Sequence, residues 1–259
     1  MLAFILVFTV AGASGVVMWD RWWREAGSGN AGMDCPTVVK GHSRVPFAAF
    51  GVQRVALIGD SIMDQASCSI AESLSDLGIT TTRHAVGGTG MLTGFVDWVA
   101  STKEILRAEK PDIVVAIFVG NYFPPPIHDA NGAVIEAGTA AFYKAWRDRA
   151  AVLSAEVHAA HARMYWVSPP PITEPSLSHA ARLFAGYRTL PGDHFLSSGR
   201  VLTGPHDSVL MEKNTCGHRR VIRNADRIHL TGDGARLYGQ QIAHDLTAGW
   251  GILTAPRPC

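Results

Sequence analysis

The stretch DIVVAIFVG, residues 112–120, is the feature that most limits what this chain can fold into. It is a continuous apolar run and not an alternating one, as expected for a strand buried on both faces of a parallel sheet. Around it, strand-like and helix-like segments alternate. This alternation predicts an α/β fold, a three-layer α/β/α sandwich with a mainly parallel sheet. We expect strands at about 53–58, 80–86, 112–119 and 163–168, and helices at about 62–77, 93–108, 138–162 and 232–248.

The composition fits one domain with a substantial core. The chain has 259 residues, of which 47% are hydrophobic and 17% charged, and we expect the folded domain to span residues 52–259. The formal net charge is +1, and no block of Lys and Arg is present that could follow a phosphate backbone. These features argue against nucleic acid as a partner.

The first 23 residues form a membrane-directed segment in this interpretation. Residues 1–19 carry no charge, and the following DRWWRE resembles an interfacial belt of aromatic and basic side chains. The segment is either a retained anchor or a signal peptide, with AGA at 11–13 as a cleavage site; a buried N-terminal helix is the third alternative. Residues 24–51, rich in Gly, Ala and Ser, are expected to be a tether. Either membrane interpretation places the domain outside the cytoplasm.

The cysteines favour disulfides over a metal site. Cys35, Cys68, Cys216 and Cys259 show no CxxC spacing, which argues against a zinc site. Cys68 is expected on the exposed face of the helix that follows Ser61, and an exposed thiol in an oxidising compartment predicts a disulfide with a cysteine of a peripheral segment. Which cysteine that is stays open. The opposite, apolar face of this helix is formed by Ile62, Ala66, Ile70, Leu74 and Leu77.

The sequence GDS at 59–61 stands where the first predicted strand meets the first predicted helix. A strand-to-helix turn presents a side chain at the carboxyl edge of a sheet, beside free N–H groups of the helix, and this suits a nucleophile. The same position suits an N-cap, for which Ser is a preferred residue. Ser61 is therefore a candidate nucleophile or a helix cap.

Asp226 and His229 lie three residues apart, just before a helix that Thr231 could cap. Within one tight loop, a carboxylate at this spacing can accept the Nδ1–H of the imidazole and leave Nε2 free to take a proton from a hydroxyl. Asp226 would orient the ring, and His229 would act as general base. The alternative is a solvent-exposed pair with no catalytic task.

Two further elements follow predicted strands, HAVGGTG at 84–90 and VGNYF at 119–123. A glycine lets a backbone N–H approach a ligand closely, and an Asn side chain is a neutral donor. Gly88 and Asn121, together with the Ser61 N–H, could form an oxyanion hole; Gly90 is the alternative to Gly88. Alternatively, the glycines only make a turn and Asn121 satisfies loop backbone. The Pro-rich loops YFPPPI and SPPPITEPS should lie at the same edge of the sheet.

The ordered set of these motifs resembles the SGNH/GDSL hydrolase superfamily, whose name refers to its Ser, Gly, Asn and His. The resemblance covers about residues 53–248 and implies an SGNH/flavodoxin-like fold. It implies Ser61 as nucleophile, Gly88 and Asn121 as oxyanion donors, and Asp226 and His229 as the rest of a triad. One departure stands out, because the family usually shows Gly-x-Asn-Asp and this chain has Tyr122 after the Asn.

An α/β-hydrolase nucleophile elbow is excluded, because Met63 stands where that motif needs its second glycine. His158 and His161 are three residues apart on a predicted helix, but no further ligand spacing completes a metal site, and a solvated face is expected.

From the ordered motifs we expect a serine esterase without metal or cofactor that acts on small acyl esters, such as O-acetyl groups of envelope glycans or lipids. An O-acyltransferase is the alternative, since VIRNADRIHLT resembles SGNH modules of envelope acyltransferases; a catalytically silent glycan-binding module is the third candidate.

Overall fold

A computed structural model describes residues 35–42, 51–92, 96–122, 127–128, 131–173, 177 and 179–250. The predicted membrane-directed segment at 1–23 lies outside these residues, as do most of the predicted tether and Cys259. Within the described part of the chain, no helix has both the length and the apolar character needed to cross a membrane.

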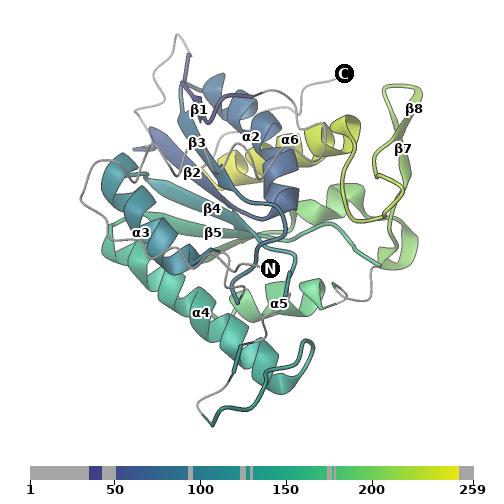
Figure 1. The fold of residues 1–259 in the computed structure, drawn as a ribbon. Coiled ribbons are helices and arrows are strands. Elements are labelled where there is room, and N and C mark those ends of the chain that lie inside the picture. Colours follow the sequence, from purple (N-terminus) through teal and green to yellow (C-terminus); the bar gives the residue numbers. More distant parts are fainter. Residues whose placement is uncertain are drawn as a thin grey trace, which may run out of the picture.

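The centre of the fold is one six-stranded sheet with the order β1-β3-β2-β4-β5-β6 (Figure 1). All neighbouring pairs are parallel except β1 with β3, which is antiparallel. The predicted α/β fold with a mainly parallel sheet is confirmed. The strands are β1 (Val38–Val39), β2 (Arg54–Gly59), β3 (Thr80–Ala85), β4 (Ile113–Ile117), β5 (Arg163–Val167) and β6 (His194–Leu196).

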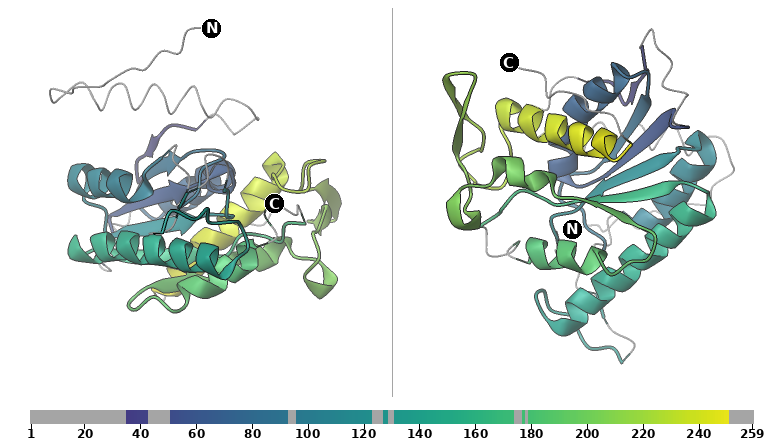
Figure 2. Two further views of the ribbon diagram at one scale, coloured as in Figure 1. Left: turned by 60° about the horizontal axis from the view of Figure 1, so that its bottom comes forward. Right: turned by 180° about the vertical axis from the view of Figure 1, so that it is seen from behind.

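Helices cover both faces of this sheet, as Figures 1 and 2 show. Along β2, Val55 and Leu57 join the core formed with α2 and α6, whereas Ala56 and Ile58 join the core formed with α3, α4 and α5. Both sets are buried because successive side chains of a strand point to opposite faces. The helices are α2 (Ser61–Ser75), α3 (Trp98–Glu109), α4 (Ala140–Ala159), α5 (Ala180–Tyr187) and α6 (Gly232–Ala248).

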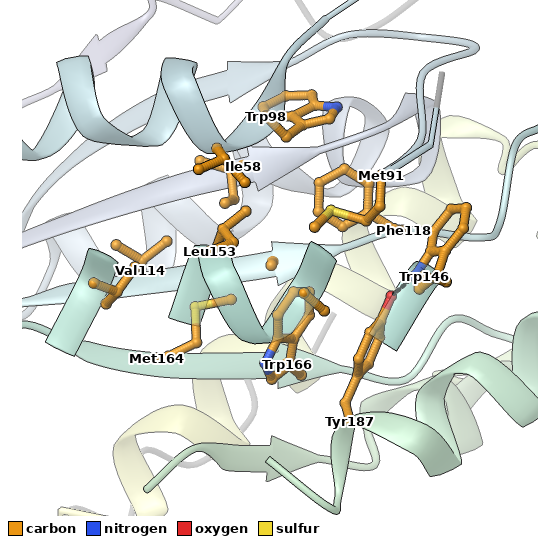
Figure 3. Packing of buried hydrophobic residues seen from close by; sticks show 14 of the residues in the cluster. Ile58, Met91, Trp98, Val114, Phe118, Trp146, Leu153, Met164, Trp166 and Tyr187 are labelled. Carbon is orange, nitrogen blue, oxygen red and sulfur yellow. Dashed lines mark hydrogen bonds between the residues drawn. The ribbon is translucent and has the colours of Figure 1, made fainter. Parts of the chain in front are cut away.

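Aromatic side chains fill the core on the α3–α4–α5 side (Figure 3). The rings of Trp166 and Tyr187 are stacked with their centroids 4.0 Å apart. The Tyr187 hydroxyl accepts a hydrogen bond of 2.6 Å from the indole nitrogen of Trp146. Because this donor and acceptor satisfy each other, the two large residues are buried without an unpaired polar group between them.

Several short elements escape prediction from the sequence. They are α5, β6, the 3₁₀ helices Ser198–Leu202 and Pro205–Asp207, and the hairpin of β7 (Glu212–Thr215) and β8 (His218–Val221), which stands out beside α6 (Figure 2). Segments of three to eight residues carry too few positions for a periodicity to be recognised. β1 lies inside the range 24–51 that is expected to be a tether, and its pairing with β3 makes this part of the range an edge strand.

The predicted exposure of Cys68 is wrong, because its exposed fraction is only 2%. The apolar stripe of α2 is buried as expected at Ile62, Ala66, Ile70 and Leu74. The opposite face is covered too, since residues 35–42 run along α2 and β3, and the backbone N–H of His42 donates to the carbonyl of Ser75 at 3.0 Å. A helical wheel describes only the residues of the helix itself, so it does not predict that residues 35–42 cover this face.

The two histidines predicted to form a solvated face differ from each other: His158 lies in the last turn of α4, and His161 lies beyond the end of that helix. His161 is exposed. His158 is half-buried, and its Nε2 lies 3.0 Å from Oδ1 of the buried Asp193. The second oxygen of Asp193 accepts hydrogen bonds from Ser154 and Trp166 at 2.7 and 2.8 Å. His158 therefore contacts the carboxyl group that supports the loop before β6.

Candidate active site

The strand order reverses between β2 and β4, because β3 follows on one side of β2 and β4 on the other. In open parallel sheets, ligands bind beyond the carboxyl ends of the strands at such a point. Ser61 stands two residues after β2, and Asn121 stands four residues after β4. The topology therefore brings two of the predicted site residues to this edge.

Asp60, and not Ser61, is the N-cap of α2. Its Oδ1 accepts the N–H of Ile62 at 3.0 Å, and its Oδ2 accepts the N–H of Val119 at 2.6 Å. The buried carboxyl group thus joins the start of α2 to the segment after β4. Because Asp60 satisfies the helix end, the half-buried Ser61 is not needed as a cap, and the capping alternative for Ser61 is wrong.

Burial raises the pKa of Asp60 to about 7. The backbone N–H groups of Val119 and Ile62 and the charge of His229 act in the opposite direction, since they stabilise the carboxylate. The carboxyl group is fully buried, so the loss of water around it outweighs these donors.

Ser61, His229 and Asp226 form a connected chain of hydrogen bonds. The Oγ of Ser61 lies 3.0 Å from Nε2 of His229, and Nδ1 of the same ring lies 2.6 Å from Oδ2 of Asp226. With the ring proton on Nδ1, that nitrogen donates to the carboxylate while Nε2 accepts from the serine hydroxyl. This arrangement can move a proton from Ser61 to His229.

The loop that carries the histidine is shaped by Asp226. Oδ1 of Asp226 accepts the backbone N–H groups of Ile228 and His229, both at 2.9 Å. Partial burial raises the pKa of Asp226, but the hydrogen bonds from His229 and from the two backbone N–H groups outweigh it and hold the pKa below its usual value. The carboxylate therefore stays ionised at neutral pH and orients the imidazole.

Two side chains that sequence reasoning missed hold this loop in place. The amide of Gln65, one turn after Ser61 on α2, accepts the N–H of Leu230 at 2.9 Å and donates to its carbonyl at 3.2 Å. The buried guanidinium of Arg223 donates to the carbonyls of Ile228 and Pro171 at 2.5 and 2.9 Å. The amide ties the histidine loop to the helix that begins with Ser61. The guanidinium ties the same loop to the Pro-rich loop after β5.

No sequence signal identified Arg223, because nothing marked it as buried. The position of Gln65 one turn beyond Ser61 was a signal, but its partner is 165 residues away and is visible only in the fold.

The structure gives Gly88 and Gly90, the two glycine candidates for the oxyanion hole, different surroundings. A Cβ added to Gly87 would lie 3.7 Å from the Cβ of Ser61, so the residue before Gly88 lies beside the serine. Gly88 is exposed and has a φ of +73°, which favours glycine. A side chain at Gly90 would come within 2.1 Å of the carbonyl oxygen of Asn121, and this packing explains that glycine.

The side chain of Asn121 is buried and oriented by two acceptors. Its Nδ2 donates to the carbonyl of Thr89 at 3.0 Å and makes a longer contact of 3.5 Å with Oδ2 of Asp60. The longer contact is the weaker one. Tyr122, which replaces the usual Asp, turns away from this group: its hydroxyl donates to the carbonyl of Ile135 at 2.5 Å and accepts the N–H of Ile127 at 3.0 Å.

Metal ligands do not gather anywhere in the described part of the chain, where no group of three His, Cys, Asp or Glu side chains is placed to hold an ion. The chemistry available at this edge of the sheet is that of a hydroxyl, an imidazole and a carboxylate.

The sequence profile of a family described as "Protein of unknown function (DUF459)" matches residues 54–245, which include β2, the helix with Ser61 and the loop with His229. The chain belongs to the DUF459 family. The match to the DUF459 profile covers most of the folded domain of this protein. No curated protein matches its sequence.

The fold of this DUF459 member is that of SGNH/GDSL esterases and acylhydrolases. A psychrotrophic esterase from Pseudoalteromonas sp. superposes with a TM-score of 0.52 at 11% identity, over 77% of this chain and 100% of that one. An acetylxylan esterase from Geobacillus stearothermophilus gives 0.54 at 14% identity, over 77% and 94%. A GDSL-like lipase from Bacteroides thetaiotaomicron gives 0.53 at 14%, over 89% and 98%. At these identities the likeness concerns the fold alone.

Proposed function

We propose that this protein is a serine esterase that hydrolyses small acyl esters, such as O-acetyl groups of envelope glycans or lipids. The observation that supports this most directly is the connected set of Ser61 Oγ, His229 Nε2 and Asp226 Oδ2, with distances of 3.0 and 2.6 Å. The likeness of the fold to esterases is consistent with it. An extracytoplasmic location is part of the proposal and rests on the apolar character of residues 1–19.

The reaction begins when His229 accepts the proton of the Ser61 hydroxyl at Nε2. The serine oxygen then attacks the carbonyl carbon of the ester, and Asp226 stabilises the imidazolium through its bond to Nδ1. His229 returns the proton to the leaving alcohol as the carbon–oxygen bond breaks. A water molecule, deprotonated by His229, attacks the acyl-serine; the carboxylic acid leaves and Ser61 regains its proton.

Negative charge on the carbonyl oxygen needs donors in place before the reaction. We assign this role to the N–H of Ser61, the N–H of Gly88 and the side chain of Asn121. The capping bonds of Asp60 involve the N–H groups of Ile62 and Met63 and not that of Ser61. For Asn121, the N–H with the weaker contact to Asp60 is the one that would turn to the oxyanion.

The test is activity-based labelling of the purified protein with a fluorophosphonate, read by mass spectrometry of the modified peptide. We expect one adduct, on Ser61, and loss of both labelling and p-nitrophenyl acetate hydrolysis in Ser61→Ala. Ser73→Ala is the matched control, because Ser73 lies on the same helix and its hydroxyl donates to the carbonyl of Ser69 at 2.8 Å. A folded Ser61→Ala protein with full esterase activity would refute the proposal.

Hydrolysis and acyl transfer are separated by competition, since both pass through acyl-Ser61. An activated acetyl ester is given together with increasing amounts of a glycan acceptor. A hydrolase releases acetate at a rate that the acceptor barely changes. Acetylated glycan that rises with acceptor while free acetate falls would indicate a transferase, because a bound acceptor hydroxyl can outcompete water.

A further inference from the structure

The segment Cys35–His42 is held against α2 and β3 by side-chain contacts outside the candidate active site. Arg83 of β3 is central to them. Its guanidinium donates to the carbonyl of Cys35 at 2.6 Å and to the Oγ of Ser67 at 2.6 Å, and its backbone N–H donates to the carbonyl of Thr37 at 2.9 Å. Arg83 therefore connects the segment that carries Cys35 with the helix turn that carries Cys68.

The thiols of Cys35 and Cys68 meet at this place. Their side chains are hydrogen-bonded to each other, and both are thiols in the structure. Cys35 is partly exposed, whereas Cys68 is buried. Cys216 already lies in a disulfide, so it is not a partner for Cys68.

We propose that Cys35 and Cys68 are a redox pair that closes to a disulfide and fastens the N-terminal edge strand β1 to the helix that begins with Ser61. Both cysteines stand on segments whose positions are fixed by other contacts of the fold. Cys68 sits on the third turn of a fifteen-residue helix, and Cys35 is fixed by its carbonyl bond to Arg83 and by the pairing of β1 with β3.

The two cysteines have different chemical roles. The hydrogen bond with Cys68 lowers the pKa of Cys35 to about 7, and the charge of Arg83 supports this against the effect of burial. The same hydrogen bond and burial raise the pKa of Cys68. A thiolate is the attacking species in disulfide exchange, so Cys35 reacts first with an external disulfide and the buried Cys68 is its resolving partner.

The exchange balances with a small or protein disulfide as the oxidant. The Cys35 thiolate attacks one sulfur of that disulfide, forms a mixed disulfide and releases the first oxidant thiolate. Cys68 loses its proton and attacks the Cys35 sulfur, which releases the second thiolate. Two thiols of this protein have then lost two electrons and two protons, and the oxidant has become two thiols.

The test uses the full chain, reduced and then equilibrated in glutathione buffers of stepwise oxidation, trapped with an alkylating reagent and mapped by peptide mass spectrometry. We expect a cross-linked peptide of Cys35 and Cys68 that appears as one two-electron transition. The disulfide would join two cysteines that are 33 positions apart in the sequence. We expect it to raise the Tm by roughly 5–10 °C.

Single serine variants test the order of attack. In Cys68→Ser, glutathione should accumulate on Cys35, because the resolving thiol is missing. In Cys35→Ser, Cys68 should stay unmodified in the folded protein. A cross-link of Cys68 to Cys259, or complete alkylation of both thiols in the most oxidising buffer, would overturn the proposal. The wild-type cross-link needs no variant and no esterase activity, so this result is independent of the proposed function.

Discussion

Replacing Asp226 by Asn tests the proposed proton relay with almost no change in shape. In the native loop, Oδ1 of Asp226 accepts two backbone N–H groups, those of Ile228 and His229, and Oδ2 accepts the Nδ1–H of His229. An Asn side chain has one oxygen acceptor and one NH₂ donor. The two hydrogen bonds from backbone N–H groups, of about 1 kcal/mol each, outweigh the one hydrogen bond from the imidazole. The amide oxygen of the Asn should therefore face the two backbone N–H groups. The NH₂ group then faces Nδ1.

This orientation reverses the tautomer of His229. Nδ1 must accept from the amide, the ring proton moves to Nε2, and Nε2 donates to Ser61 instead of accepting its proton. The loss of the general base predicts a kcat lower by about 10³–10⁴-fold, which corresponds to about 4–5.5 kcal/mol in the activation barrier. The free energy of unfolding should change by less than about 1 kcal/mol, since the Asp226 side chain is 42% exposed.

The assay is steady-state hydrolysis of p-nitrophenyl acetate, with kcat and KM measured separately and the Tm as a check of folding. Asp233→Asn is the matched control: this carboxylate lies in the first turn of α6 and pairs with Arg236 at 3.0 Å, and its removal should leave kcat within about twofold. If Asp226→Asn keeps more than a tenth of the wild-type kcat while Ser61→Ala is inactive, the tautomer argument is wrong.

Three further predictions follow from the site. Gln65→Leu removes the clamp on the histidine loop, so kcat should fall roughly 10–100-fold with little change in KM; a change confined to KM would contradict a positioning role. Because burial raises the pKa of Asp60 to about 7, the folded state holds a proton that the unfolded chain loses near pH 4. The free energy of unfolding should therefore fall by on the order of 4 kcal/mol between about pH 4 and 7, and urea titrations of Asp60→Asn should lack this component; an identical pH profile would count against it. Chelators should leave esterase activity unchanged, and loss of rate restored by added zinc would point to a metal mechanism.

The sequence by itself determined the four inner strands of the sheet and the order of the site motifs. The apolar run at 112–120 predicts a strand buried on both faces, and β4 is such a strand. The spacing of Asp226 and His229 predicts contact within one loop, which the structure has at 2.6 Å. Such features depend on neighbours in the sequence, where periodicity and loop length leave few alternatives.

Tertiary structure decided the contacts between distant segments that no motif marks. Cys68 lies on the polar face of its helix, yet residues 35–42 cover it. Asp60 is the N-cap of α2, a role for which the sequence analysis considered Ser61, and the same carboxyl group also reaches Val119 after β4. The clamp between Gln65 and Leu230 spans 165 residues. The burial of a side chain and its contacts with distant residues are set by how the layers of the fold pack. The distances between residues far apart in the sequence follow from that packing and cannot be read from a single sequence.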